Sequence, residues 1–458
     1  MISISTNLAN IFKRRTAEEQ PAWLTLIGIV SIIIYAISRT GFPKVAEITS
    51  AVAVLAGLWG LFKYGKVVNS HILIRFLWVS ILFQLISWGL AQYITPEWAE
   101  STPHLSNING WLIFIPFAWL ISQRKNAIWL MWGAAALGVL LSPWITGKGF
   151  DEVASGINGT RVDFDLYNAQ HTAFFFGSIF ILLCCFGKRL FQKNKLLIIP
   201  TILLVYYTLL VVYISQTRQA WLATTITLIT VLTYILIRKL KTCSNTKRLY
   251  VITCFIVSLI TLTTLAVNND RITKRFMSEK ESISAISSLN FDNVPYSSFG
   301  IRFHSWVAAT DFIAEKPIFG WGSNGKSLVI DHTEWLPESI KKHFGHLHNT
   351  YLELLVNYGI VGLLFYFSIW IVIGRMLFKE IKLGNIEKDF GYAYVSILLF
   401  WGVMNSFESY QNFWTGEFYF NIFMAGVVAK IWFVKLLKPQ LSDVNDNDSS
   451  DKILLEKQ

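Results

Sequence analysis

Residues 346–349 read His-Leu-His-Asn and stand at the end of a long polar stretch, directly before an apolar run of membrane-spanning length. Histidine changes its charge close to neutral pH, so a neutral imidazole can accept a proton from a hydroxyl group. In an extended His-x-His pair both rings point to one side of the chain. His346 and His348 are therefore candidates for a general base, and the pattern leaves open which of them acts. The tetrad indicates an active site where a polar loop meets a membrane helix.

Basic residues at other helix entrances add a second kind of chemistry. Arg218 lies in the tight connection between two apolar runs, and Arg302 begins a helical stretch. His348 precedes the first turn of a helix, where unpaired backbone N–H groups supply positive potential. Arg161 lies in another polar connection, residues 145–171. Grouped together, these side chains would favour a dianionic or pyrophosphate group.

The composition requires that these residues be positioned by membrane helices. Of the 458 residues 53% are hydrophobic and only 15% charged, which is too few polar side chains to cover a water-soluble surface. The sequence predicts an all-α polytopic membrane protein with about twelve transmembrane helices, each long enough to cross about 30 Å of hydrocarbon. The predicted spans are 22–38, 45–62, 71–94, 110–122, 126–144, 172–187, 196–214, 219–237, 249–267, 351–375, 390–407 and 417–434.

The distribution of lysine and arginine predicts the orientation, because short basic loops stay on the cytoplasmic side. Alternate connections are basic, and both termini fall on that same side. The formal net charge of +11 is explained by this pattern and by attraction to anionic headgroups, so no nucleic-acid partner is expected. The predicted segments are 1–21 (cytoplasmic), 22–267 (spans one to nine), 268–350 (large exterior loop), 351–438 (spans ten to twelve) and 439–458 (a polar, disordered cytoplasmic tail).

The loop 268–350 is the one sizeable interruption of the span pattern. Within it residues 302–316 place large apolar side chains at near-helical spacing, and Pro317 ends the run. We expect an amphipathic helix over the outer membrane face. Gly320-Trp-Gly-Ser-Asn-Gly325 fits the GxGxxG pattern, but no strand precedes it, so a turn is expected there rather than a dinucleotide site.

The motifs resemble those of a known family. His348-Asn349, separated by nine residues from Gly359-Ile-Val-Gly362, combines with Arg218-Gln-Ala-Trp-Leu222. This pair is similar to the motif pair of the bacterial O-antigen ligase family. Arg302-x-x-x-Trp306 and the His-x-His-Asn tetrad also resemble motifs of the broader superfamily, which includes polymerases and protein O-oligosaccharyltransferases.

The resemblance implies a function on the periplasmic face of the bacterial inner membrane. An O-antigen ligase transfers polysaccharide from undecaprenyl pyrophosphate to a sugar hydroxyl of the lipid A–core, without a metal or other cofactor and with inversion. By this resemblance His348 is the general base, and Arg218 and Arg302 bind the pyrophosphate. The predicted substrate-binding residues are His346, Arg161, Asn349 and Trp306.

The same residues allow alternative interpretations. His343, His346 and His348 could ligate a metal, but their spacing matches no strong metal pattern, and Asp163, Asp165 and His171 are no better. An O-antigen polymerase would use the same donor with a second lipid-linked glycan as acceptor. A transporter would be expected to carry ionisable residues near the middle of its spans, whereas here they gather at span ends.

Overall fold

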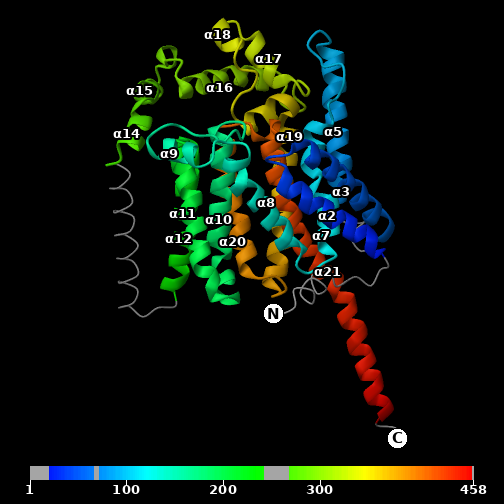
Figure 1. Cartoon of the computed structure of the whole chain (residues 1–458). Helices are drawn as coiled ribbons and strands as arrows, with labels where there is room; N and C mark the ends of the chain where they lie inside the picture. The colour runs from blue at the N-terminus through cyan, green and yellow to red at the C-terminus, as the bar shows by residue number, and fades with distance from the viewer. Residues whose placement is uncertain (1–19, 66–71, 242–267, 456–458) are drawn as a thin grey trace.

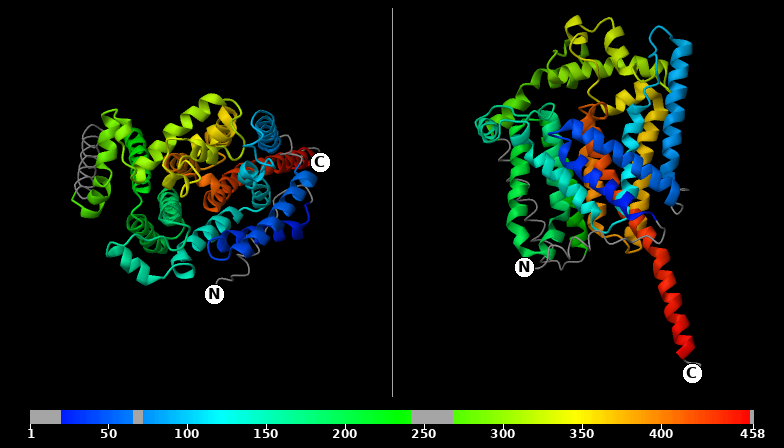
Figure 2. Two further views of the ribbon diagram at one scale, coloured as in Figure 1. Left: turned by 90° about the horizontal axis from the view of Figure 1, so that it is seen from above. Right: turned by 45° about the vertical axis from the view of Figure 1, so that its right-hand side comes forward.

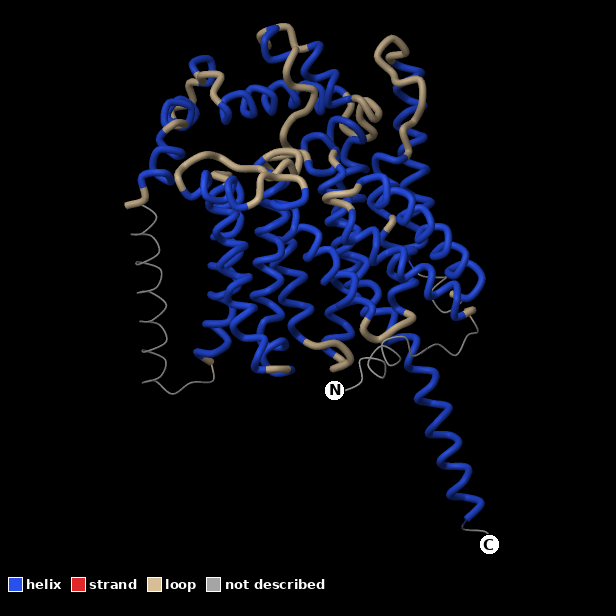
Figure 3. The backbone as a smooth tube through the Cα atoms, in the orientation of Figure 1, coloured by secondary structure: helices blue, strands red, loops and turns tan. Residues whose placement is uncertain are grey.

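The computed structural model describes residues 20–65, 72–241 and 268–455, and these residues form helices and loops with no strand among them (Figure 3). The long helices of the bundle are α2 (Ala22–Ser38), α3 (Pro43–Tyr64), α5 (Ile72–Ile94), α8 (Ala127–Ile145), α10 (Ala169–Lys193), α11 (Ile198–Ile214), α12 (Arg218–Leu240), α19 (Thr350–Lys382), α20 (Lys388–Asn405) and α21 (Trp414–Leu455). Shorter elements of the bundle and its loops are α6 (Ser106–Asn109), η1 (Gly110–Leu112), α7 (Phe114–Ser122), α9 (Phe150–Ile157), η2 (Lys195–Leu197) and η4 (Tyr410–Asn412).

Every predicted span within the described residues corresponds to one of these helices, and the predicted span 249–267 lies outside them. Eight of the described helices are long and apolar enough to cross a membrane, so this is a multi-pass membrane protein. Shorter apolar helices cover 22–38 and 106–122. The second of these contains the predicted span 110–122, and its main helix α7 is buried at every residue.

The packing order is seen in how much of each helix is buried. Helix α21 packs against α7, α8 and α19, and 83% of its apolar window is buried, which places it at the centre. Only 22% of the corresponding window of α12 is buried, so α12 lies at the periphery. Exposed Leu, Ile and Trp side chains on α3, α5 and α11 form surfaces suited to lipid.

Residues 270–349 form a covering layer over one end of the bundle (Figures 1 and 2). Its elements are α14 (Asp270–Met277), α15 (Lys280–Ser287), η3 (Phe291–Asn293), α16 (Ser298–Glu315), α17 (Gly325–His332) and α18 (Glu338–Lys341). A helix is confirmed there as α16, which runs across the bundle end (Figure 1). It is not the amphipathic helix that was predicted, because its buried face consists of Gly300, His304, Ser305, Ala308 and Ala309 rather than of the large apolar side chains. Ser297 caps its start by accepting a hydrogen bond from the N–H of Gly300, and it ends before Pro317.

Helix α19 is broken at Gly359, and the break holds the covering layer. Gly359 has φ 62°, and a Cβ there would collide with the backbone of Ile318 and Phe319. Directly after the break, the N–H of Ile360 donates to the carbonyl of Pro317 at 2.8 Å. Directly before the break, carbonyls of α19 accept hydrogen bonds from the N–H groups of Trp321 and Gly322 at 2.9 Å each. The segment 317–322 is thus the expected turn, and only glycine allows so close an approach.

The other end of the bundle carries the C-terminal extension. Composition predicts disorder after Pro439, whereas α21 continues as helix to Leu455 and projects away from the other helices (Figure 1).

Candidate active site

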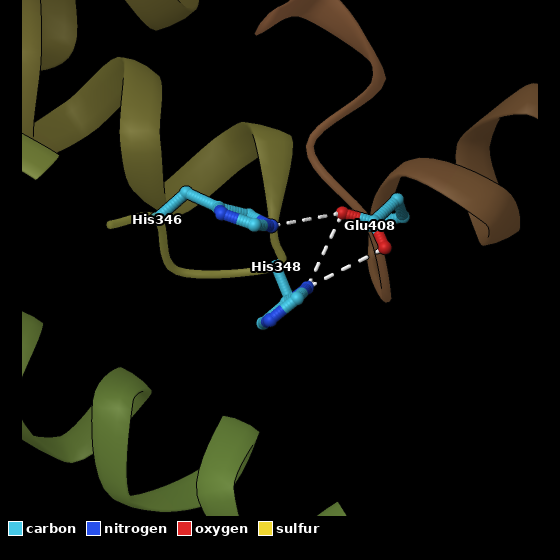
Figure 4. A group of neighbouring side chains, drawn as sticks. All are labelled: His346, His348 and Glu408. Atoms are coloured by element: carbon cyan, nitrogen blue, oxygen red, sulfur yellow. Dashed lines mark hydrogen bonds and ion pairs between the residues drawn. The ribbon is translucent and has the colours of Figure 1, made fainter. Parts of the chain in front are cut away.

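The side chains of His346, His348 and Glu408 point toward one another (Figure 4). His346 and His348 come from the loop before α19, and Glu408 from the connection between α20 and η4. The Nδ1 of His348 lies 3.2 and 3.4 Å from the two carboxylate oxygens of Glu408. The Nε2 of His346 lies 3.3 Å from one of the same oxygens. Only 11% of the His348 side chain and 2% of the Glu408 side chain are exposed.

The loop that carries the histidines is fixed by its neighbours. His348 has φ 51°, a left-handed conformation that is uncommon for residues other than glycine. On one side of it Trp306 donates its indole N–H to the carbonyl of Leu347 at 2.9 Å. The N–H of Leu347 in turn donates to the carboxylate of Glu353 at 2.8 Å. The surrounding structure therefore holds His348 in its unusual backbone conformation.

Glu353 joins this loop to the one that carries Glu408. Its carboxylate is fully buried and accepts hydrogen bonds from Ser409 at 2.5 Å, from Gln411 at 3.0 Å and from Asn412. Because it lies in the first turn of α19, the helix dipole also favours its negative charge. Glu353 thus sets the distance between His348 and Glu408.

We expect Glu353→Ala to destabilise this junction strongly. Each buried donor that loses its acceptor costs about 1–3 kcal/mol, and four donors point at this carboxylate. The free energy of unfolding should therefore fall by at least about 2 kcal/mol. The apparent melting temperature of the purified protein in detergent measures it. Glu338→Ala is the matched control, because that carboxylate is 74% exposed and should matter by less than about 0.5 kcal/mol. Equal melting temperatures for the two variants would show that Glu353 has no such role.

His348 and Glu408 form a dyad whose protonation follows from burial and mutual contact. Burial lowers the pKa of His348, and the nearby Glu408 only partly opposes this. Burial acts to raise the pKa of Glu408, but the two imidazoles outweigh it and hold that pKa well below its usual value. A neutral imidazole beside a carboxylate anion follows. Its Nδ1–H donates to Glu408, which leaves Nε2 with a free lone pair on the side away from Glu408 (Figure 4).

A cavity of about 300 Å³ lies between the covering layer and the bundle, and Phe407, the residue before Glu408, is part of its lining. Four arginines and one carboxylate line it, together with apolar side chains that include Leu222, Phe276 and Phe299. The charged residues are Arg161, Arg218, Arg275, Arg302 and Glu279. So many cations around one space repel each other, and a bound anion would relieve that repulsion.

The arginines are held by contacts that leave part of each guanidinium for a ligand. Arg218 donates to Glu279 at 2.8 Å and to the carbonyl of Arg275 at 2.9 Å. Arg161 donates its Nε–H to the carbonyl of Ser215 at 3.2 Å. Burial, followed by the charges of Arg275 and Arg302, lowers the pKa of Arg161. The cavity therefore has a strongly positive potential.

Arg302 connects the cavity to the dyad. Its Nε–H donates to the carbonyl of Phe407, the residue before Glu408, at 3.2 Å, and its Nη1 donates to Ser298. Burial lowers the pKa of Arg302, whereas the charge of Glu408 raises it. The charge of Arg302 in turn contributes to lowering the pKa of His348. An anion held by Arg302 would therefore lie next to the imidazole.

The three predicted catalytic residues thus belong to one region, although they lie far apart in the sequence. Arg161 lines the same cavity, and the ring of His346 lies 4.0 Å from that of His348 between centroids. Asn349 caps α19 by accepting hydrogen bonds from the N–H groups of Tyr351 and Leu352. Trp306 holds the histidine loop. Asn349 and Trp306 therefore both have structural contacts, and their contact with a glycan stays a prediction.

Sequence reasoning missed Arg275, Glu279, Glu353 and Glu408. Glu353 and Glu408 were visible only as acidic residues at span ends. Arg275 and Glu279 lie in a polar stretch for which the sequence predicts no role, and no motif marks them.

His343, which the sequence offers as a possible metal ligand, does not join His346 and His348, because its Nδ1 is 2.7 Å from the carbonyl of Ser339. Among the described residues, His346, His348 and Glu408 are the group of donors close enough to hold a metal ion.

These features define a multi-pass helical membrane protein with a basic, imidazole-containing site at one end of the bundle. Comparison with known proteins points to a family. The family model described as O-antigen ligase matches residues 203–367, and this match supports membership of the O-antigen ligase family, whose members are membrane glycosyltransferase-like enzymes. The matched segment includes Arg218, Arg302 and His348, whereas Arg161 and Glu408 lie outside it.

A similar protein from Haemophilus influenzae, described as uncharacterized, is 29% identical over 164 residues. The match covers 34% of this chain and 40% of that protein, so it spans less than half of either. It gives no substrate.

Proposed function

We propose that this protein is an O-antigen ligase. It transfers polysaccharide from undecaprenyl pyrophosphate to a sugar hydroxyl of the lipid A–core, at the periplasmic face of the inner membrane. The observation that carries the proposal is the arginine-lined cavity, which is connected to the His348–Glu408 dyad through Arg302 and Phe407. This transfer needs a group that accepts a proton close to a site that binds a diphosphate.

The proposed reaction is a single displacement. The acceptor sugar hydroxyl gives its proton to Nε2 of His348 as its oxygen attacks the anomeric carbon of the donor. The bond from that carbon to the pyrophosphate oxygen breaks, and its electron pair stays on the diphosphate. Arg302 and Arg218 stabilise this leaving charge, and attack from the opposite side inverts the anomeric centre. Glu408 stabilises the imidazolium that forms.

His348 is proposed as the base in preference to His346 for a geometric reason. His348 makes the aligned hydrogen bond through Nδ1 to Glu408, which orients its Nε2 away from the carboxylate. His346 turns its own Nε2 toward Glu408, so that nitrogen is not free for a hydroxyl. His346 then serves to hold Glu408 or the substrate.

Deletion of the gene tests the function directly. We expect the high-mass lipopolysaccharide ladder to vanish from a gel, while lipid-linked polymer accumulates and the complete core remains. Restoring the wild-type gene should restore the ladder. A core that carries a single repeat unit after deletion would indicate a polymerase instead, and unchanged lipopolysaccharide with altered solute uptake would indicate a transporter.

A further inference from the structure

The three donor atoms of His346, His348 and Glu408 lie close enough together to hold a metal ion. The Nε2 of His346 and the Nδ1 of His348 lie 3.3 and 3.2 Å from the same carboxylate oxygen. In a tetrahedral zinc site with bonds of about 2.0–2.1 Å, neighbouring ligand atoms are about 3.3–3.4 Å apart. Both nitrogen-to-oxygen distances therefore approximate two edges of such a tetrahedron, and all three donor atoms lie within 4.8 Å of one another.

The orientation of His346 separates this arrangement from an ordinary hydrogen bond. Although its Nε2 is 3.3 Å from the carboxylate, that buried nitrogen makes no aligned hydrogen bond with any described residue. The carboxylate therefore satisfies this nitrogen poorly, whereas buried polar atoms are normally well bonded. A cation between the two imidazoles and the carboxylate would satisfy it. The side chain of His346 is 25% exposed, so its ring has room to close the remaining gap.

The donor set identifies the kind of ion. Two imidazoles and one carboxylate suit zinc and its neighbours in the transition series, whereas magnesium and calcium prefer oxygen ligands alone. Phe344 and Phe413 lie 5.6 and 5.7 Å from the rings of His348 and His346, and such an apolar surrounding favours a dehydrated site. Glu408 offsets part of the ion's charge, while the Arg302 guanidinium opposes binding, so the ion should be exchangeable rather than permanent.

We propose that His346, His348 and Glu408 form a binding site for a zinc-class divalent ion, and that the bound ion inhibits the enzyme. The inhibitory part rests on the proposed function. When the ion bonds to Nδ1 of His348, the single ring proton of the neutral imidazole must reside on Nε2. That nitrogen can then no longer accept the proton of the sugar hydroxyl, and Glu408 is bound to the ion as well. The enzyme with an ion in this site therefore cannot use His348 as the general base.

Binding is tested on the purified full-length protein in detergent, without any glycan substrate. Cobalt(II) is added first, because a tetrahedral site gives it intense visible absorption, and zinc is then used to displace it. We expect one ion per chain for the wild type. His346→Ala and Glu408→Gln should each weaken binding by at least about 10- to 100-fold, the range that even outer-shell changes cause.

His343→Ala is the matched control, since it removes an imidazole from the same loop that lies outside the cluster. Its affinity should equal that of the wild type. Gel filtration checks that each variant remains folded. The site does not exist if the wild type binds no stoichiometric ion, or if His343→Ala weakens binding as much as His346→Ala does.

Inhibition is tested separately with lipid-linked glycan and lipid A–core. Zinc should suppress transfer at the concentration that fills the site, and a chelator should restore it. Stoichiometric binding with undiminished transfer would overturn the inhibitory claim alone. Failure of the proposed function is distinguishable, because the chelated wild type would then show no transfer at all.

Discussion

His348→Ala should abolish glycan transfer almost completely while leaving the protein in the membrane. General-base catalysis contributes about 10²- to 10⁴-fold, and a loss in that range is expected in a transfer assay with lipid-linked donor and lipid A–core. The reason is geometric. Among its close neighbours His348 alone combines an aligned hydrogen bond to Glu408 with a second ring nitrogen turned away from that carboxylate.

Two further variants make this result specific. Glu408→Gln keeps the shape of the side chain but removes the charge that stabilises the imidazolium, so it should also lower transfer substantially. His343→Ala is the matched control and should transfer at the wild-type rate, because its ring bonds only to the carbonyl of Ser339. Near-normal transfer by His348→Ala, with the variant present at wild-type abundance, would remove His348 from the mechanism.

Arg302→Ala should produce the second-largest effect, a loss of about 10²- to 10³-fold in kcat. That is the usual cost of removing one group that stabilises developing negative charge. Arg302→Lys should recover only part of the rate. Lysine keeps the charge but cannot donate from one position to the carbonyl of Phe407 and from another to Ser298, as the planar guanidinium does.

Arg375→Ala provides the control for loss of an arginine as such. It removes an exposed arginine from the far part of α19, away from the cavity, and should leave kcat unchanged. Rates measured at saturating donor distinguish the two roles of Arg302. A change confined to KM would mean that Arg302 only binds the diphosphate, and an unchanged kcat/KM would exclude it from the cavity's chemistry.

The helices were predictable because their signals are local. Apolar runs of sufficient length specify the bundle, and the spacing of large apolar residues with a stop at Pro317 specifies α16. The twelve-span count stays a prediction, since 249–267 lies outside the described residues and eight helices meet the criterion of length and composition. The break at Gly359 was not predicted, because glycine is common in membrane helices and its partner segment lies about 40 positions earlier.

The site was only half predictable for a related reason. Arg218, Arg302 and His348 carry recognisable motifs, and all three fall within the matched segment. Glu408 has no motif and reaches His348 only because α19 and α20 pack against each other. Arg275 and Glu279 enter the cavity through the fold of the covering layer. Contacts of this kind depend on tertiary packing, which residue spacing does not encode.

The two edges of the covering layer are attached in different ways. At the α19 edge, backbone groups of residues 317–322 are bonded to backbone groups at the helix break. At the α14–α15 edge, Arg218 is joined to Glu279 through side chains. Arg271 and Arg275 of α14 add hydrogen bonds to the carbonyls of Gly156 and Gln216. An incoming diphosphate that competes for Arg218 would release one of these side-chain attachments while leaving the backbone bonds at the α19 edge in place. We therefore expect the arriving substrate to loosen the α14–α15 edge first.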